Sequence, residues 1–482
     1  MNRKFVFNMA GKVIAATGFL MLLPAVVALI YKEYKDLISF LSVAAVAILL
    51  GFVISVLVKP KTNVIYAKEG FLIVAATWLC MSVIGAVPFV LSGAIPKFMD
   101  AFFEIVSGFT TTGASILPDV ESLSHAALFW RSFSHWIGGM GLLVFMMAFL
   151  PNMSDRTIHI MRAEMPGPVV GKIVPRATDT ARILYIIYLG MTVTEFLLLL
   201  FGGMNVFESL LHTFGSAGTG GFGIKGDSIA SYSPYCQWVI TVSMFLFGIN
   251  FNLYYLILIR RFKSVFRSGE LWAYVGISVA AVALICNNIY SSCANFGEAL
   301  RLSAFQVSSI VTTTGYSTTD FNMWPSFSKT ILLLLMIVGA CAGSTAGGFK
   351  VSRVVIIIKS VRKQIKSLLH PRSVNTVSFE GKTIDDETLK GVTSYLGIYC
   401  LCIVEFLFLI SLDKFGDIET NISAVIACFN NIGPGFGGVG PMSNYSGYND
   451  ISTLTLSMAM LFGRLEIFPM IIFFSPSTWT KK

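Results

Sequence analysis

Apolar residues along this chain gather in blocks that are long enough to cross a lipid bilayer. A transmembrane helix needs about 20 predominantly apolar residues in succession. The pattern predicts ten such helices, near residues 13–31, 38–58, 71–91, 127–150, 183–202, 236–260, 271–290, 329–359, 392–412 and 451–475. Four shorter apolar stretches, near 98–110, 205–217, 298–311 and 421–430, each continue into a segment rich in Gly or Thr. Their length fits re-entrant half-helices, with surface helices as the alternative.

The composition agrees with a membrane protein. Of the 482 residues, 55% are hydrophobic and only 13% are Asp, Glu, Lys or Arg, whereas a soluble domain carries roughly 25% charged residues. This balance excludes a soluble enzyme, a nucleic-acid-binding domain and a disordered chain. We therefore expect a multi-pass protein surrounded by membrane lipid, with no nucleic-acid partner.

The net charge of +9, from 35 basic and 26 acidic residues, follows the predicted topology. Most of the Lys and Arg residues lie in alternate connections between the predicted spans, and the richest of these connections runs from Lys350 to Lys390. Because cytoplasmic loops carry an excess of Lys and Arg, both termini are predicted to be cytoplasmic. The four short stretches then fall on the outer side. The basic start is followed by no small-residue cleavage site, so we expect a retained first helix and not a signal peptide.

Cysteine and histidine give no sign of a metal site. The eight cysteines lie mostly inside apolar blocks, and the five histidines are scattered singly. Buried thiols are the expected state, although Cys286 and Cys293 could form one disulfide if both face an oxidising side.

A fourfold repeat is the strongest signal in the sequence. Four twelve-residue strings align without gaps, and each ends in a glycine. They are FFEIVSGFTTTG (102–113), LLHTFGSAGTGG (210–221), AFQVSSIVTTTG (304–315) and AVIACFNNIGPG (424–435). The repeat predicts four units, each made of a helix, a half-helix, an extended Gly-containing loop and a second helix. We place two additional N-terminal helices in 1–68 and the four units in 69–182, 183–268, 269–388 and 389–482.

Such units suit an ion pore. Within a bilayer, non-helical backbone is tolerated only where protein buries it or where it lines a water-filled cavity. Four extended loops around one pseudo-fourfold axis could form rings of carbonyl oxygens that replace the hydration shell of an alkali cation, and each half-helix would aim its negative C-terminal end at the axis. Close packing of small residues is the simpler explanation for any one string. The residues expected to form the filter are Thr111, Thr112, Gly113, Thr219, Gly220, Gly221, Thr313, Thr314, Gly315, Ile432, Gly433, Pro434 and Gly435.

At these strings the sequence resembles the Trk/Ktr/HKT superfamily of potassium transporters, and within it the bacterial TrkH/TrkG type. TTTGAS (110–115), SAGTGGFG (216–223), TTTGYST (312–318) and NNIGPGFG (430–437) are similar to the four filter segments of that family. The fourth segment departs most, because Asn430, Asn431 and Pro434 stand where the other segments have threonines. The resemblance covers essentially the whole chain, including the two N-terminal helices.

The resemblance implies an all-α integral membrane fold and potassium uptake across the bacterial inner membrane. It also implies a homodimer in which each protomer has its own pore, regulated by a cytosolic TrkA-like nucleotide-binding ring. CAGSTAGGFK (341–350) is similar to the family's intramembrane gating loop, and FGRLEIFP around Arg464 is similar to its last inner helix. The gate residues implied are Gly343, Ser344, Thr345, Ala346, Gly347, Gly348, Lys350 and Arg464.

Elementary geometry supports an interruption at this loop. The block at 329–359 would be about 46 Å long as one helix, whereas the hydrocarbon core is about 30 Å thick. Four glycines and the polar pair Ser344–Thr345 lie inside it. The helix could therefore end and restart here, although Gly339, Gly343 and Gly347 are four residues apart and could instead form a packing face.

Arg464 lies well inside the last predicted span, where a charged side chain is costly. It should face protein or a water-filled pore. Glu195 and Glu405, at matching positions in MTVTEFLLLL and LCIVEFLFLI, are the buried acids available to pair with it. Two interpretations of Arg464 are retained: an ion pair with one of these acids, and a cationic side chain that faces the pore.

No nucleotide site is expected in this chain. GTGGFG (218–223) and GFGGVG (435–440) satisfy G-x-G-x-x-G, but neither follows a strand or opens a soluble helix, as the dinucleotide motif requires. We therefore expect potassium to be the transported ion, driven by membrane potential, and no enzymatic activity. The alternative function is an ion-coupled secondary transporter, a sodium or proton symporter with discontinuous helices.

Overall fold

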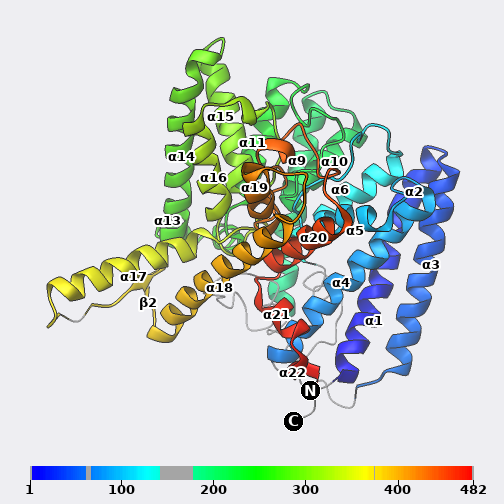
Figure 1. The fold of residues 1–482 in the computed structure, drawn as a ribbon, viewed down its shortest axis with the longest axis horizontal. Coiled ribbons are helices and arrows are strands. Elements are labelled where there is room, and N and C mark those ends of the chain that lie inside the picture. Colours follow the sequence, from blue (N-terminus) through cyan, green and yellow to red (C-terminus); the bar gives the residue numbers. More distant parts are fainter. Residues whose placement is uncertain (1–2, 61–66, 142–176, 374, 480–482) are drawn as a thin grey trace.

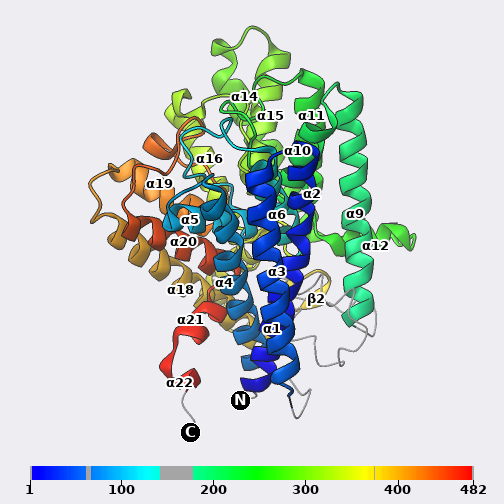
Figure 2. The same ribbon diagram turned by 90° about the vertical axis from the view of Figure 1, so that its right-hand side faces the viewer.

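The computed structural model of the protein describes residues 3–60, 67–141, 177–373 and 375–479, and nearly all of its regular structure is helical (Figure 1). The chain begins with α1 (Arg3–Leu20), α2 (Leu22–Ile30) and α3 (Tyr34–Leu57). α1 and α3 run side by side (Figure 2). A Cβ added at Gly51 would lie 2.4 Å from the carbonyl oxygen of Gly11. Small residues at such points let membrane helices pack closely.

Four groups of helices follow, and in each group a long helix is followed by a short helix, an extended segment and another helix. The first group holds α4 (Ala67–Ser92), α5 (Phe98–Phe109) and α6 (His125–Met140). The second holds α9 (Ala177–Phe201), α10 (Val206–Gly218), α11 (Pro234–Phe247), α12 (Phe251–Leu258) and α13 (Phe262–Phe266). The third holds α14 (Gly269–Ile289), α15 (Phe296–Val311), α16 (Ser326–Val338) and α17 (Val351–Leu369). The fourth holds α18 (Asp386–Ile410), α19 (Ile418–Phe429), α20 (Asp450–Arg464), α21 (Phe468–Phe474) and α22 (Pro476–Trp479).

Fewer helices can cross a membrane unbroken than the sequence predicts. In the described residues, six are long and apolar enough, or seven if the pair α11–α12 is counted as one span. The long first helices of the four groups and the N-terminal pair supply the six, at Arg3–Ile30, Tyr34–Leu57, Lys68–Ser92, Asp179–Phe201, Gly269–Ser292 and Asp386–Ile410. The chain is thus a multi-pass membrane protein, and in the described residues several of the ten predicted spans are broken helices.

The interruptions fall in the last helix of the later groups. α11 and α12 meet at an angle of 91° across residues 248–250. α16 ends at Val338 and α17 begins at Val351, so the broken-helix prediction for 329–359 is confirmed. α20 and α21 are separated by residues 465–467, of which Glu466 and Ile467 have φ of 55° and 66°. Left-handed residues cannot continue a right-handed helix, which is why 451–475 is not one span. The remainder of the predicted span 127–150 beyond Gly141 lies outside the described residues.

The short helices α5, α10, α15 and α19 are buried along most of their length. Three of them begin at a side-chain cap: Asn205 accepts a hydrogen bond from the amide of Glu208, Asn295 from that of Glu298, and Asp417 from that of Thr420. Caps of this kind satisfy the free amides of a first turn. The start of each of these helices is therefore fixed by its own sequence, and the C-terminal end can be aimed inward.

A small element lies where α17 leaves the bundle. α17 extends away from the other helices (Figure 1), and the strands β1 (Ser378–Phe379) and β2 (Lys382–Thr383) form an antiparallel pair beyond it. Val377 and Phe379 pack against Ile356 of α17 and Leu389 of α18. This cluster ties the base of α17 to the start of the fourth group.

Candidate functional site

Each of the four short helices ends in the same backbone turn. A non-glycine residue with left-handed φ follows each helix: Thr111 (54°), Thr219 (55°), Thr313 (57°) and Asn431 (58°). Two residues later a glycine has positive φ: Gly113 (78°), Gly221 (71°), Gly315 (87°) and Gly433 (99°). Left-handed conformations are rare for β-branched residues such as Thr. Their recurrence at one position of all four segments indicates that the fold imposes the turn.

This turn corrects the alignment of the fourth string. The ungapped register pairs Gly435 with Gly113, Gly221 and Gly315, but the residue with the matching conformation is Gly433. Gly435 packs against Ser423 of α19, and its amide donates to the carbonyl of Val439. The sequence Gly433-Pro434-Gly435 offers two glycines to a gapless alignment, and only the backbone decides between them.

The four turns close a ring. A Cβ added at Gly113 would lie 1.9 Å from the carbonyl oxygen of Gly220, one at Gly221 would lie 1.9 Å from that of Thr314, and one at Gly315 would lie 2.0 Å from that of Ile432. At Gly433 it would lie 2.7 Å from that of Thr112, which returns to the first segment. Each segment thus touches the next through backbone. Glycine is required at all four places because a neighbouring carbonyl fills the space of a side chain.

Side chains of the ring brace its backbone. The hydroxyls of Thr110 and Thr112 are 2.8 Å apart, as are those of Thr312 and Thr314. In the fourth segment the side-chain amide of Asn431 donates to Thr112 Oγ1 (3.0 Å) and to the carbonyl of Met460 (2.9 Å). The hydroxyls within each of these two threonine pairs are therefore engaged with each other.

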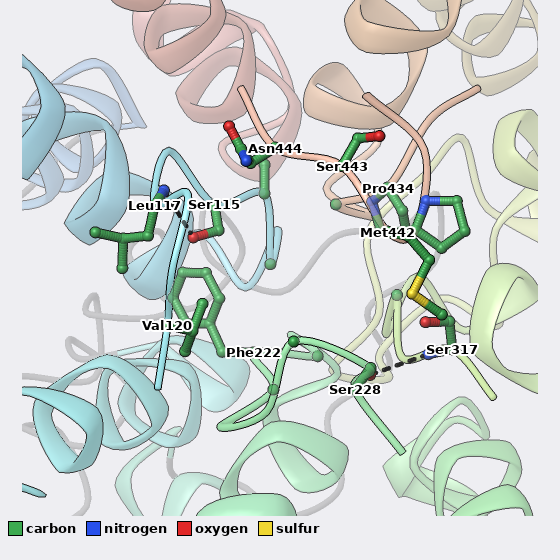
Figure 3. A pocket seen from close by; sticks show the side chains of 18 of the residues that line it. Ser115, Leu117, Val120, Phe222, Ser228, Ser317, Pro434, Met442, Ser443 and Asn444 are labelled. Atoms are coloured by element: carbon green, nitrogen blue, oxygen red, sulfur yellow. Dashed lines mark hydrogen bonds between the residues drawn. The ribbon is translucent and has the colours of Figure 1, made fainter. Parts of the chain in front are cut away.

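A cavity of about 160 Å³ opens on one side of the ring and is lined by all four turn glycines (Figure 3). Ser115, Phe222, Ser317 and Pro434, each just beyond a turn, lie around it in the same view. Four short helices point their C-terminal ends toward this place, and each end carries a partial negative charge of about half a unit. The arrangement can hold a monovalent cation that has lost part of its water shell.

Two charged residues at the ring were missed from sequence. Glu104 of α5 and Arg131 of α6 form an ion pair with Nε and Oε1 2.7 Å apart, and their side chains are 0% and 1% exposed. The available signal was a charged residue inside an otherwise apolar segment, which in a membrane protein marks a functional site. His135, one turn after Arg131, is also buried and contacts the carbonyl of Gly108 through Nδ1 (2.8 Å).

On the other side of the ring, the loop at 339–350 crosses beneath it. The amide of Gly347 donates to Thr313 Oγ1 (2.7 Å), and a Cβ at Gly347 would lie 2.4 Å from the carbonyl oxygen of Asn430. Gly343 accepts from the amide of Phe251 (3.0 Å), and Cys341 donates to the carbonyl of Gly248 (3.1 Å). The loop is thus fixed to the second, third and fourth groups. Its tight contacts with the ring leave no room for side chains at Gly347.

Arg464, the last residue of α20, holds the loop to the first group. Its guanidinium donates to the carbonyl of Thr345 (2.8 Å) and to those of Gly138 (2.5 Å) and Gly139 (2.9 Å) at the end of α6. A cavity of about 30 Å³ lies here, lined by Arg464, Gly343, Ser344, Ala346, Gly348 and Lys350, among others. The Lys350 ammonium is buried and hydrogen-bonded to the carbonyl of Ala346. The predicted gate residues therefore lie together.

Of the two acids predicted to be buried, one is buried and the other is not. Glu195 is buried, as predicted, and lies beside Ser216 and Ser243. Glu405 is exposed, because Cys402, Phe406 and Ile410 turn the other face of α18 inward. The two matching positions thus have different surroundings. Two other acids lie in this region. Glu466 Oε2 is 2.5 Å from the guanidinium of Arg353, and the buried Glu270 accepts a hydrogen bond from the amide of Ala342 in the loop (2.7 Å).

All eight cysteines are free thiols, so Cys286 and Cys293 do not form a disulfide. Among the described residues, no group of three or more His, Cys, Asp or Glu side chains is placed to hold a metal ion.

Comparison with known proteins places this architecture. The family model TrkH, described as a cation transport protein, matches residues 38–275 and 272–481. The Trk system potassium uptake protein TrkH of Salmonella typhimurium is 34% identical over 99% of this chain and 100% of its own length. TrkG of Escherichia coli K12, also a Trk system potassium uptake protein, is 33% identical over 99% of this chain and 98% of its length. The crystal structure of the potassium transporter TrkH from Vibrio parahaemolyticus superposes with a TM-score of 0.88 at 30% identity, covering all of both chains.

The bond between Thr313 and Gly347 gives a first prediction. Thr313→Val removes the acceptor of a buried amide, and an unsatisfied buried donor costs about 1–3 kcal/mol. We expect faster hydrogen exchange of the amides at 343–348 and a lower melting temperature in detergent. Thr313→Ser keeps the oxygen and should behave like the wild type, as should Thr330→Val on the exposed face of α16. Unchanged exchange in Thr313→Val would show that this bond does not hold the loop.

Proposed function

The chain belongs to the TrkH family of cation transport proteins, and we propose that it takes up potassium through the ring formed by its four glycine turns. It is a transport protein and not an enzyme. Relatives about one third identical over the whole chain are named potassium uptake proteins. The transported ion is proposed to be potassium itself, and we place no nucleotide site in this chain.

The observation that carries the proposal is the closed ring of backbone contacts. A dehydrated cation needs oxygens fixed around it at one spacing. Each turn glycine here fits against the carbonyl of the next segment, within 1.9–2.7 Å of where a Cβ would lie. We assign the filter to 111–113, 219–221, 313–315 and 431–433, because Asn431 and Gly433 have the turn conformations of Thr111 and Gly113, and we leave Pro434 and Gly435 out. This assignment makes the four groups of helices quasi-equivalent quarters around one pore, with α5, α10, α15 and α19 as pore helices.

Membrane potential would supply the driving force. An inside-negative potential of 100 mV is worth about 2.3 kcal/mol for a monovalent cation, which corresponds to roughly 50-fold accumulation. Uptake then requires no chemical energy source within the chain. This fits a protein of the bacterial inner membrane with both termini in the cytoplasm and the cavity beside Gly113 on the outer side.

We assign the gate to the loop 343–350 together with Arg464. The loop lies directly beneath the ring, where Gly347 touches Thr313 and Asn430. Arg464 adds a positive charge on the same side and ties the loop to α6. A cation leaving the filter would meet packed backbone and a guanidinium. Opening would require the loop to move aside, and α17, which begins immediately after it, would be the lever.

A cytosolic partner would move this lever. The relatives belong to a named Trk system, and such a name implies more than one component. We propose that a TrkA-like nucleotide-binding ring docks on the cytoplasmic face, where the stretch from Lys350 to Lys390, which includes α17, carries nine of the 35 basic residues. We also propose that the transporter is a homodimer with one pore in each protomer.

Reversal potentials of the purified protein in planar bilayers test the proposed function. An uncoupled potassium path predicts a reversal potential that follows the potassium gradient alone. The alternative, a sodium or proton symporter, predicts a shift when a sodium or pH gradient is added at constant potassium. A shift of that kind would overturn the uncoupled mechanism.

In the same assay, Gly113→Ala and Gly315→Ala should lower the potassium-over-sodium permeability ratio, because each methyl would displace a carbonyl of the ring. Gly190→Ala, which has nothing within 4 Å of the added Cβ, is the matched control.

Deletion of Gly343–Gly347 tests the gate. The deletion should raise potassium flux in the absence of any partner, because the backbone that obstructs the path is removed. Arg464→Ala should raise flux less, and it should lower the melting temperature because the carbonyls of Thr345, Gly138 and Gly139 lose a charged donor. A folded deletion variant with wild-type flux would place the gate elsewhere.

A further inference from the structure

The Glu104–Arg131 ion pair is the most deeply buried of the ion pairs in the described part of the chain. It joins the short helix α5 to α6 within the first group. Removing two charges from water is expensive, and apolar residues of similar volume often hold a structure as well. A pair kept at this depth beside an ion path therefore calls for an explanation beyond packing.

The carboxylate of Glu104 fixes the segment that follows Gly113. Oε2 accepts from the amide of Ile116 (2.9 Å), and both oxygens accept from Ser115 Oγ (3.0 and 3.2 Å). The first turn of the ring is thus anchored on its outer side by a side chain from its own short helix.

The guanidinium of Arg131 reaches the second segment. Its Nη1 donates to the carbonyl of Gly223 (3.3 Å), and its Nη2 donates to Ser115 Oγ (3.3 Å). Its Cζ lies 4.1 Å from the centre of the Phe222 ring. Charge-assisted bonds of this kind are stronger than neutral ones. One residue therefore contacts the backbone or side chain of two neighbouring segments of the ring.

His135 reinforces the same junction from one helical turn away. Its Nδ1 donates to the carbonyl of Gly108, and its Nε2 accepts from the amide of Phe222 (3.3 Å), which assigns the neutral Nδ1–H tautomer. Its ring lies 4.3 Å from that of Phe222. Phe222, the residue directly after Gly221, is thus contacted by both Arg131 and His135.

Other junctions of the ring are crossed by neutral hydrogen bonds. The amide of Ile229 donates to the carbonyl of Ser317 between the second and third groups, and the amide of Tyr445 donates to that of Ser115 between the fourth and the first. Between the third and fourth groups, Asn322 exchanges hydrogen bonds with the backbone of Gly437. Lys329 of α16 and Glu419 of α19 also form an ion pair between the third and fourth groups, but their side chains are 26% and 53% exposed. The junction between the first and second segments differs because its charge pair is buried.

We propose that Glu104 and Arg131 are positioning residues for ion selectivity, which set the separation of the first and second ring segments and keep a positive charge at the outer cavity neutralised. Arg131 lines that cavity together with the four turn glycines. The inference rests on the proposed filter. Without Glu104 the guanidinium would repel arriving cations, and without Arg131 the carboxylate would attract them.

The test uses the full-length protein with Glu104→Gln, Arg131→Gln and the double variant, measured as potassium and sodium currents in planar bilayers. Each single variant should lower the potassium-over-sodium permeability ratio by about fivefold or more, as expected for residues in direct contact. The permeability ratio of the double variant should be no lower than that of the more strongly affected single variant. Lys97→Gln is the matched control and should keep the wild-type permeability ratio. Lys97 lies at the start of α5 and forms an exposed ion pair with Asp450 of α20.

A second readout separates positioning from mere folding. Glu104→Gln should raise the potassium concentration that gives half-maximal current, and Arg131→Gln should lower it. A general loss of stability would change the amount of folded protein, or shift both variants in the same direction. Folded single variants with wild-type ratios, or effects that multiply in the double variant, would overturn the proposal. If Gly315→Ala loses selectivity while these variants keep it, the inference fails and the filter stands; if Gly315→Ala also keeps it, the filter itself is wrong.

Discussion

Direct contact between backbones, with no side chain between them, is the constraint on which the structure depends. Each turn glycine faces the carbonyl of the next segment, and a methyl group at Gly113 or Gly221 would sit 1.9 Å from an oxygen. Non-helical backbone inside a membrane is stable only when protein or a water-filled cavity surrounds it. The four short helices, the braced threonines and the buried Glu104–Arg131 pair all serve to keep that backbone in place. In the proposed filter, carbonyl groups of this backbone would replace the water of a cation.

The same constraint explains the region beneath the ring. The carbonyls of Gly138 and Gly139 near the end of α6, together with that of Thr345 in the loop, accept hydrogen bonds from one guanidinium, that of Arg464. Helix ends leave carbonyls without intrahelical partners, and a buried end needs a donor from elsewhere. Arg464 therefore has a structural reason to be kept inside the helix bundle, and in the proposed mechanism the same placement makes it a barrier to cations. The proposed gate and the packing of the inner helices would then depend on one side chain.

The sequence predicted the ring better than the helices around it. Three of the four strings have the register that the structure gives them, because Thr-x-Gly recurs with one spacing. The fourth string is displaced by two residues. A sequence pattern cannot distinguish Gly433 from Gly435, and in the structure only Gly433 has the positive φ of the turn. The breaks at 248–250 and 465–467 were not foreseen, because apolar residues continue through both and the left-handed Glu466 and Ile467 leave no mark in composition. Glu405 was misplaced because matching sequence positions do not guarantee matching helix faces, and Arg131 was overlooked because its importance comes from a contact with the next group of helices.

The position of bound ions tests the central claim most directly. A crystal structure of the purified protein in rubidium or thallium, with anomalous scattering, would locate monovalent cations without reference to transport rates. The account predicts anomalous density on the axis of the ring, bounded by residues 111–113, 219–221, 313–315 and 431–433, and weakened when sodium replaces these ions. Density confined to another place, such as the surroundings of the buried carboxylate of Glu195, with an empty axis, would contradict it.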